Sequence, residues 1–125
     1  MARILIAEDE KDIRDLIAFT LSYAGHQVTV TTNGEEAYLT AQEVLPDLIL
    51  LDVRMPRMTG FEACEKIKAS KKTGQIPVVF LSAKGQEVEI QTGLSLGAVE
   101  YIVKPFAPEE LVERIGAVLA NVGKA

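Results

Sequence analysis

The chain has 125 residues, of which 48% are hydrophobic and 25% charged, a balance typical of a folded globular chain and not of a disordered one. Its formal net charge of −5 argues against a nucleic-acid contact within this segment and against a basic membrane-binding face. No apolar run approaches the roughly 20 residues of a membrane-spanning helix, and the acidic residues near the start argue against a secretion signal. Because the single cysteine, Cys64, leaves no internal disulfide, we expect a cytoplasmic location.

The first half of the chain predicts two strand–helix units. The run Arg3–Ala7 is apolar enough for a strand buried on both faces. The apolar stripe of the helix that follows is formed by Ile13, Leu16, Ile17 and Leu21. This helix should end at Gly25, because glycine is typical of helix C-termini. A second strand is predicted over Gln27–Thr31, and a second helix from an Asn33 cap to Val44.

The second half of the chain predicts three further units of the same kind. Strands are expected over Asp47–Leu51, Pro77–Leu81 and Glu100–Val103. The helices that follow them are expected from Thr59, over residues 86–96 and from Pro108, which is favourable in a first helical turn.

Five strand–helix units in succession predict an α/β fold with one parallel sheet and helices on both of its faces. Right-handed crossovers favour the doubly wound, flavodoxin-like strand order 2-1-3-4-5, and we expect residues 1–125 to form a single domain. In this order the chain reverses direction between strands 1 and 3. Ligands bind beyond the carboxyl ends of the strands at such a switch point.

Chemically active side chains follow these strands where the carboxyl edge is predicted. The first strand leads into the acidic run Glu8–Glu10, the third into Asp52, the fourth into Ser82 and the fifth into Lys104. Carboxylates placed side by side repel one another, which predicts a hard divalent cation, and Mg²⁺ prefers oxygen ligands and is commonly shared with a phosphate.

A carboxylate can itself become phosphorylated, so these residues predict a phosphoryl-transfer site. Asp52 would be the nucleophile, Lys104 would pair with a phosphoryl oxygen, and Ser82 would donate a hydrogen bond to another. Taken singly, such acids are usually solvated, such a serine usually caps a helix, and such a lysine usually lies on the surface. Their combination on one edge favours a site.

Four motifs make the chain resemble the receiver domain of two-component response regulators over nearly its whole length. These motifs are ILIAEDE, LILLDVRMPRMTG, VVFLSAKG and GAVEYIVKPF. The resemblance implies that Asp52 is the phosphoacceptor and that Ser82 and Lys104 bind the phosphoryl group. It also implies that Tyr101 reorients in the active state and that the Lys104–Pro105 peptide is cis.

The resemblance further implies a Mg²⁺ cofactor and a set of partners. Glu8, Asp9, Asp52 and the backbone carbonyl of Arg54 would bind the Mg²⁺. A histidine kinase or phosphotransfer protein would donate the phosphoryl group. The domain would catalyse its own phosphorylation and dephosphorylation, and it would be a signalling module and not an enzyme acting on a separate substrate. An output domain or protein, or a second copy in a homodimer, would bind the face formed by the fourth helix, fifth strand and fifth helix.

The sequence argues against three alternative interpretations and leaves two points open. A flavin-binding electron carrier of the same fold would need a phosphate loop where this chain has Glu8 and Asp9, and an aspartyl-phosphate hydrolase would need an aspartate at Arg54. A receiver that is never phosphorylated would not need the full set of acids, hydroxyl and lysine. Arg54 and Lys84 either tune the lifetime of the phosphate or only balance the acids. The chain is either a stand-alone regulator or the first domain of a longer one.

Overall fold

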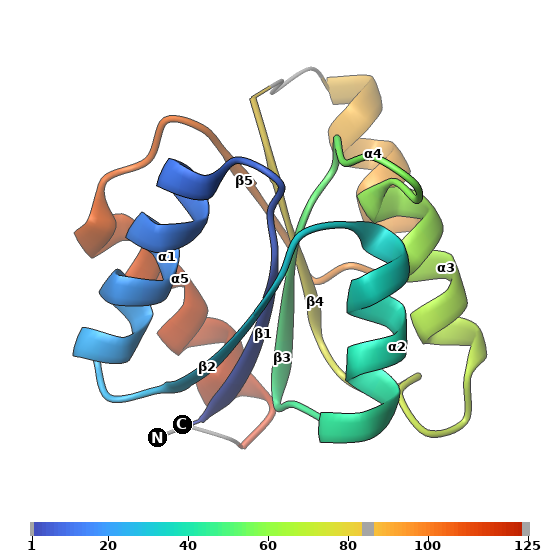
Figure 1. Ribbon diagram of the computed structural model, residues 1–125, viewed down its shortest axis with the longest axis horizontal. Coiled ribbons are helices and arrows are strands. Elements are labelled where there is room, and N and C mark those ends of the chain that lie inside the picture. The colour runs from blue at the N-terminus through green and yellow to red at the C-terminus, as the bar shows by residue number, and fades with distance from the viewer. Residues whose placement is uncertain (1, 84–86, 124–125) are drawn as a thin grey trace.

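The computed structural model describes residues 2–83 and 87–123 of the chain. Strands and helices alternate along these residues, as the sequence predicts (Figure 1). The strands are β1 (Arg3–Ala7), β2 (Gln27–Thr31), β3 (Leu48–Asp52), β4 (Val78–Ser82) and β5 (Glu100–Val103). The helices are α1 (Lys11–Tyr23), α2 (Gly34–Val44), α3 (Gly60–Ala69), α4 (Glu87–Ser95) and α5 (Pro108–Asn121).

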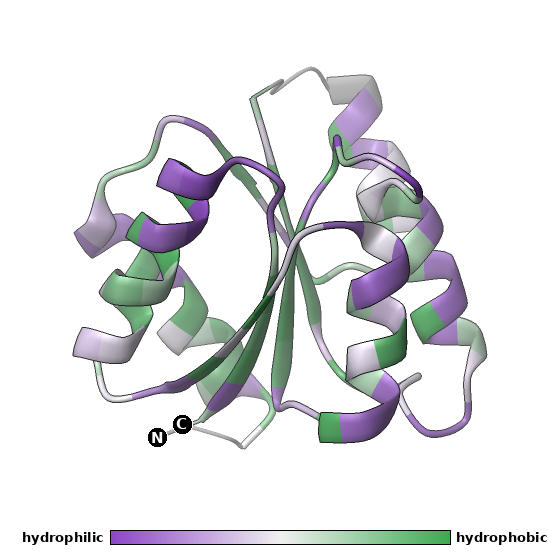
Figure 2. Cartoon of the chain, in the orientation of Figure 1, coloured by the Kyte–Doolittle hydropathy of each residue, from purple (hydrophilic) through white to green (hydrophobic). Residues whose placement is uncertain are grey.

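The strands form one parallel sheet in the order β2-β1-β3-β4-β5, which confirms the predicted topology. Helices α1 and α5 cover one face of the sheet, and α2, α3 and α4 cover the other (Figure 1). The central strands are hydrophobic along their length, whereas the outer faces of the helices are largely hydrophilic (Figure 2). All residues of β3 and β4 are buried, so the two sheet faces support one apolar layer each.

Two strands lie one residue later than the sequence pattern indicates. The predicted strand Asp47–Leu51 is shifted to Leu48–Asp52, and Pro77–Leu81 is shifted to Val78–Ser82. The polar Asp52 and Ser82 therefore lie within the hydrogen-bonded sheet, where Asp52 pairs in register with Leu81. The shift matters for the site because both side chains are held by the rigid sheet and not by a loop.

The helix boundaries follow local capping chemistry. The Asn33 side chain accepts a hydrogen bond from the Glu36 N–H at 2.8 Å, as predicted. Thr59 forms a reciprocal capping box with Glu62 at the start of α3. Helix α1 ends at Tyr23, and Gly25 follows its cap with a φ of 100°. The predicted start of the fourth helix, at residue 86, lies outside the described residues.

The predicted apolar stripe of α1 is partly wrong. Ile17 and Leu21 are completely buried, and Ile13 packs against the core, but Leu16 is 46% exposed. A helix covered on one side by a sheet buries only a narrow stripe, and Leu16 lies at its margin.

Gly60 allows α3 to begin directly against the end of β3. Its N–H donates a hydrogen bond to the carbonyl of Val53 at 2.9 Å. A Cβ at this position would overlap the carbonyl oxygen of Asp52, so a larger residue would push the helix away from the strand. The loop after Asp52 is thereby folded back tightly on the carboxyl edge of the sheet.

Candidate metal site at the carboxyl edge of the sheet

Three carboxylates meet where β1 and β3 end. Glu8 and Asp9 follow β1, and Asp52 is the last residue of β3; one oxygen from each lies within 4.8 Å of the others. Glu8 is completely buried and Asp52 is 4% exposed, whereas Asp9 is exposed to solvent. Carboxylate oxygens are ligands that Mg²⁺ and Ca²⁺ prefer, so this cluster could hold a divalent cation.

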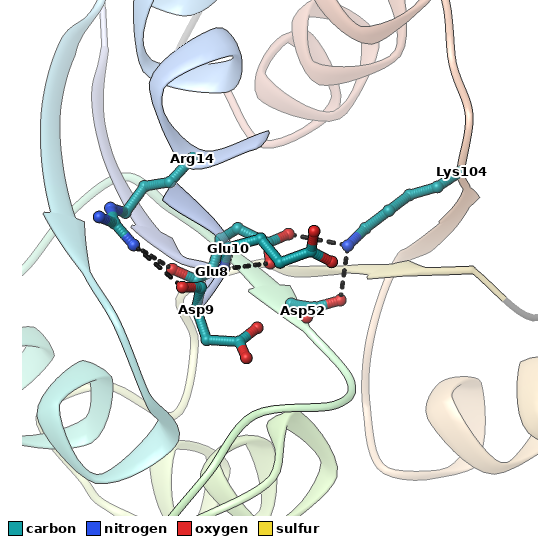
Figure 3. A network of polar contacts seen from close by, with 6 residues as sticks. All are labelled: Glu8, Asp9, Glu10, Arg14, Asp52 and Lys104. Atoms are coloured by element: carbon teal, nitrogen blue, oxygen red, sulfur yellow. Dashed lines mark hydrogen bonds and ion pairs between the residues drawn. The ribbon is translucent and has the colours of Figure 1, made fainter. Parts of the chain in front are cut away.

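Lys104 reaches the same cluster from the end of β5. Its Nζ lies 2.8 Å from Glu8 Oε1 and 3.1 Å from Asp52 Oδ1 (Figure 3). The Lys104 side chain is 12% exposed, and its two partners are more deeply buried still. Buried ion pairs of this kind are expensive to break, because removal of one partner leaves an uncompensated charge. One ammonium therefore faces three carboxylates, which leaves the cluster electronegative.

This charge distribution changes the pKa values of the cluster. Burial, and after it the negative charge of Glu8, raise the pKa of Asp52 from 3.8 to about 7 against the opposing effect of Lys104. Burial lowers the pKa of Lys104, but its hydrogen bond to Glu8 and the charge of Asp52 outweigh burial, so that pKa is raised. Lys104 is therefore a fixed cation, and Asp52 is the group that titrates near neutral pH.

The loop between β1 and α1 is tied down by hydrogen bonds to its backbone. The Glu8 N–H donates to the carbonyl of Thr31 at 3.1 Å, and the Glu10 N–H donates to Glu8 Oε2 at 3.2 Å. Arg14 Nη1 donates to the carbonyl oxygens of Glu8 and Asp9, as Figure 3 shows. Sequence reasoning missed Arg14. The only available signal was its place one helical turn after the acidic run.

Ser82 and Tyr101 form a second group of residues on the same half of the sheet. Ser82 ends β4 and is 1% exposed; it lies one position beyond Leu81, the residue that pairs with Asp52. Tyr101 on β5 is buried, and its ring centroid lies 6.2 Å from that of Phe80. Burial raises the pKa of Tyr101, and a hydrogen bond with Ser82 opposes this effect. The two predicted switch residues are therefore in contact.

The remaining predicted positions are distributed around this edge. Arg54 is exposed and forms no ion pair within the described part of the chain. Lys84 lies outside the described residues. The Lys104–Pro105 peptide bond is cis, which confirms that prediction. Among the helices of the described residues, none has both the length and the apolar character to cross a bilayer.

A doubly wound sheet binds its ligands at the switch point, and an acidic cluster at that point suits a divalent cation. The family model of the response regulator receiver domain matches residues 4–116 of the chain. The phosphate regulon transcriptional regulatory protein PhoB of Pseudomonas aeruginosa is 42% identical over 120 residues, which are 96% of this chain and 52% of that protein. The alkaline phosphatase synthesis transcriptional regulatory protein PhoP of Bacillus subtilis is 38% identical, over 94% of this chain and 48% of that protein.

A solved structure agrees with these relatives. The chemotaxis protein CheY4 of Vibrio cholerae superposes with a TM-score of 0.91 and 35% identity, over 95% of this chain and 99% of that one. The chain spans about half the length of the transcriptional regulators it matches. The chain belongs to the receiver domain family of two-component response regulators, which are signalling domains.

Proposed function

We propose that residues 1–125 form one receiver domain that takes a phosphoryl group onto Asp52 from a histidine kinase or a phosphotransfer protein. The observation that carries this proposal is the buried Asp52 carboxylate, which lies at the end of the central strand between the acids of β1 and the ammonium of Lys104. The position is held by the sheet, lies at its carboxyl edge, and is flanked by groups that suit a metal and a phosphate.

The donor set fits Mg²⁺, because three carboxylates supply hard oxygen ligands and one of them, Asp9, is open to solvent. Glu8, Asp9, Asp52 and the backbone carbonyl of Arg54 would hold the ion. Bound there, Mg²⁺ would neutralise negative charge on the transferring phosphoryl oxygens.

The residues of the chain supply the other parts of the reaction. An oxygen of the Asp52 carboxylate forms a bond to phosphorus while the bond from phosphorus to the donor imidazole nitrogen breaks, and the imidazole leaves with the electron pair. Lys104 exchanges its ion pair with Asp52 for one with a phosphoryl oxygen, and Ser82 donates a hydrogen bond to another. Attack of water on phosphorus later releases inorganic phosphate and restores the carboxylate. The domain would thus catalyse its own modification and its reversal without being an enzyme for another substrate.

The signal would pass from Ser82 to Tyr101 and then to the face formed by α4, β5 and α5. Support comes from the contact between these two side chains and from the position of Tyr101 on β5, under α4. An output domain or protein would read this face, and a homodimer on phosphorylation would use it too. Both named relatives are transcriptional regulators, which supports control of transcription as the output and a cytoplasmic place of action.

Incubation with acetyl phosphate and Mg²⁺ tests the proposal. Intact-mass measurement should show one added phosphoryl group on the wild type and on Asp15→Asn, whose carboxylate is exposed on α1. Asp52→Asn should gain none. Uptake of the same mass by Asp52→Asn would show that another residue is the phosphoacceptor. Arg54→Ala, compared under the same conditions, should change the decay rate of the phosphorylated form if Arg54 tunes its lifetime.

A further inference from the structure

Arg14 belongs to none of the roles assigned above, yet its side chain contacts the loop that carries two of the carboxylates. Its backbone N–H donates to the carbonyl of Glu10 at 2.9 Å and so starts the hydrogen-bond pattern of α1. Its half-buried guanidinium turns back over the helix start (Figure 3). There Nη1 donates to the carbonyl oxygen of Glu8 at 3.0 Å and, less closely, to that of Asp9 at 3.4 Å.

The two carboxylates differ in how firmly the rest of the protein holds them. Glu8 is fixed by Lys104, by the Glu10 N–H and by the β2 backbone. Asp9 is exposed, and within residues 2–83 and 87–123 its only hydrogen bond is the one from Arg14 to its carbonyl. In the described part of the chain, Arg14 is therefore the one side chain that hydrogen-bonds to the backbone from which the Asp9 carboxylate extends.

We propose that Arg14 is a positioning residue for the divalent-cation site: it fixes the loop between β1 and α1 through two backbone carbonyls and so holds Asp9 in place to bind the ion. This inference rests on the proposed function, because it assumes that the acidic cluster binds Mg²⁺. Groups that orient metal ligands without touching the metal typically contribute about 10- to 100-fold to metal affinity.

The sign of the effect separates positioning from simple electrostatics. A guanidinium near a cation site repels the cation, so the loss of its charge alone should strengthen Mg²⁺ binding. The loss of a positioning group should instead weaken it, because Asp9 must then be ordered at the expense of binding. The two mechanisms therefore predict opposite changes in the dissociation constant.

Lys11 provides a matched control on the same turn of α1. Its ammonium is exposed and pairs with Asp15 at 2.7 Å, and it has no contact with the loop carbonyls in the described structure. Lys11→Ala removes one positive charge from the same turn of α1 and leaves the loop hydrogen bonds intact. Arg14→Lys keeps the charge but replaces the branched guanidinium with a single ammonium.

The test is calorimetric titration of the whole chain with Mg²⁺, with circular dichroism to verify folding. We expect Arg14→Ala to raise the dissociation constant about tenfold, Arg14→Lys to raise it less, and Lys11→Ala to leave it unchanged or lower it. Binding by folded Arg14→Ala that is as tight as in the wild type, or tighter, overturns the inference, as does equal weakening in Lys11→Ala. If Arg14→Ala does not fold, Arg14→Lys decides: weaker binding than wild type supports positioning, and equal or tighter binding overturns it. Failure of the wild type to bind Mg²⁺ would instead overturn the proposed metal site.

Discussion

Replacement of Asp52 by asparagine should stabilise the domain although it removes the proposed phosphoacceptor. In the folded protein, burial and the Glu8 carboxylate raise the pKa of Asp52 from 3.8 to about 7. The folded state therefore binds more protons than the unfolded state between these values, and stability falls as pH rises from about 4 to about 7. Above pH 7 the full cost is present, and below pH 4 it vanishes.

The size of this cost follows from the pKa difference. At about 1.4 kcal/mol per pKa unit, the rise corresponds to roughly 4 kcal/mol above pH 7. The favourable effect of Lys104 is already included in this pKa, and solvent screening at the rim of the site reduces the net gain from Asp52→Asn to about 1–3 kcal/mol. For a chain of 125 residues this is a rise in Tm of about 5–10 °C.

The assay is thermal unfolding followed by circular dichroism, in chelator and in Mg²⁺, at several pH values between 5 and 8. In chelator, Asp52→Asn should melt above the wild type, and the difference should grow with pH. Mg²⁺ should stabilise the wild type by about 2.7 kcal/mol at a hundredfold excess over its dissociation constant, and Asp52→Asn by much less. Asp9→Asn should show a smaller effect of the same sign, because Asp9 is exposed. The reasoning is refuted if Asp52→Asn melts below the wild type at pH 7.5 in chelator or gains as much from Mg²⁺.

Three further predictions concern the lysine, the tyrosine and the packing of α4. Lys104→Ala should still fold but melt lower, because the fully buried Glu8 loses its ion pair, and it should give no partner response to phosphodonor. Tyr101→Ala should be phosphorylated at nearly the wild-type rate yet bind its output partner more weakly; a matching loss of phosphorylation would show that Tyr101 does not act downstream. Gly93→Ala should cost about 1–3 kcal/mol in chemical denaturation, because its Cβ would lie 2.9 Å from a buried ring on β4 and 3.2 Å from the Tyr101 ring. Its control, Gly116→Ala on α5, meets nothing within 4 Å and should stabilise by about 0.5–1 kcal/mol.

The fold was predictable because each unit carries its own local signal. The apolar runs, the cap at Asn33 and the capping residue Thr59 all depend on side chains near in sequence, and the parallel order follows from general rules of connection. The one-residue shifts of β3 and β4 were not predictable from hydrophobicity, because the strands end on polar residues that a core pattern excludes. Asp52 and Ser82 depart from the apolar pattern at the carboxyl edge, where the proposed function requires them.

The site was only partly predictable for a related reason. Because acids, a hydroxyl and a lysine follow successive strands, the sequence indicates that these side chains share one edge of the sheet. Hydrogen bonds to backbone atoms, in contrast, cannot be predicted from the types of the residues. Arg14 was missed because its partners are carbonyl oxygens, which every residue has. The pairing of Lys104 with Glu8, which are 96 residues apart, depends on the reach of a side chain across two strands.

The burial of Asp52 lowers the stability of the fold at neutral pH. It also sets the fraction of Asp52 that is ionised and could take part in the proposed reaction. Only the carboxylate form of Asp52 could act as the proposed nucleophile, and with a pKa of about 7 a substantial fraction is protonated at neutral pH. A cation held by Glu8 and Asp9 would favour the ionised form, because an opposite charge nearby lowers the pKa of a carboxyl group. By the same linkage, protons compete with the cation, so the affinity of the cluster for the cation should fall as the pH falls. In the proposed function, stability, metal affinity and the ionisation of the Asp52 nucleophile would thus be linked through one titration, which depends on how deeply β3 carries Asp52 into the sheet.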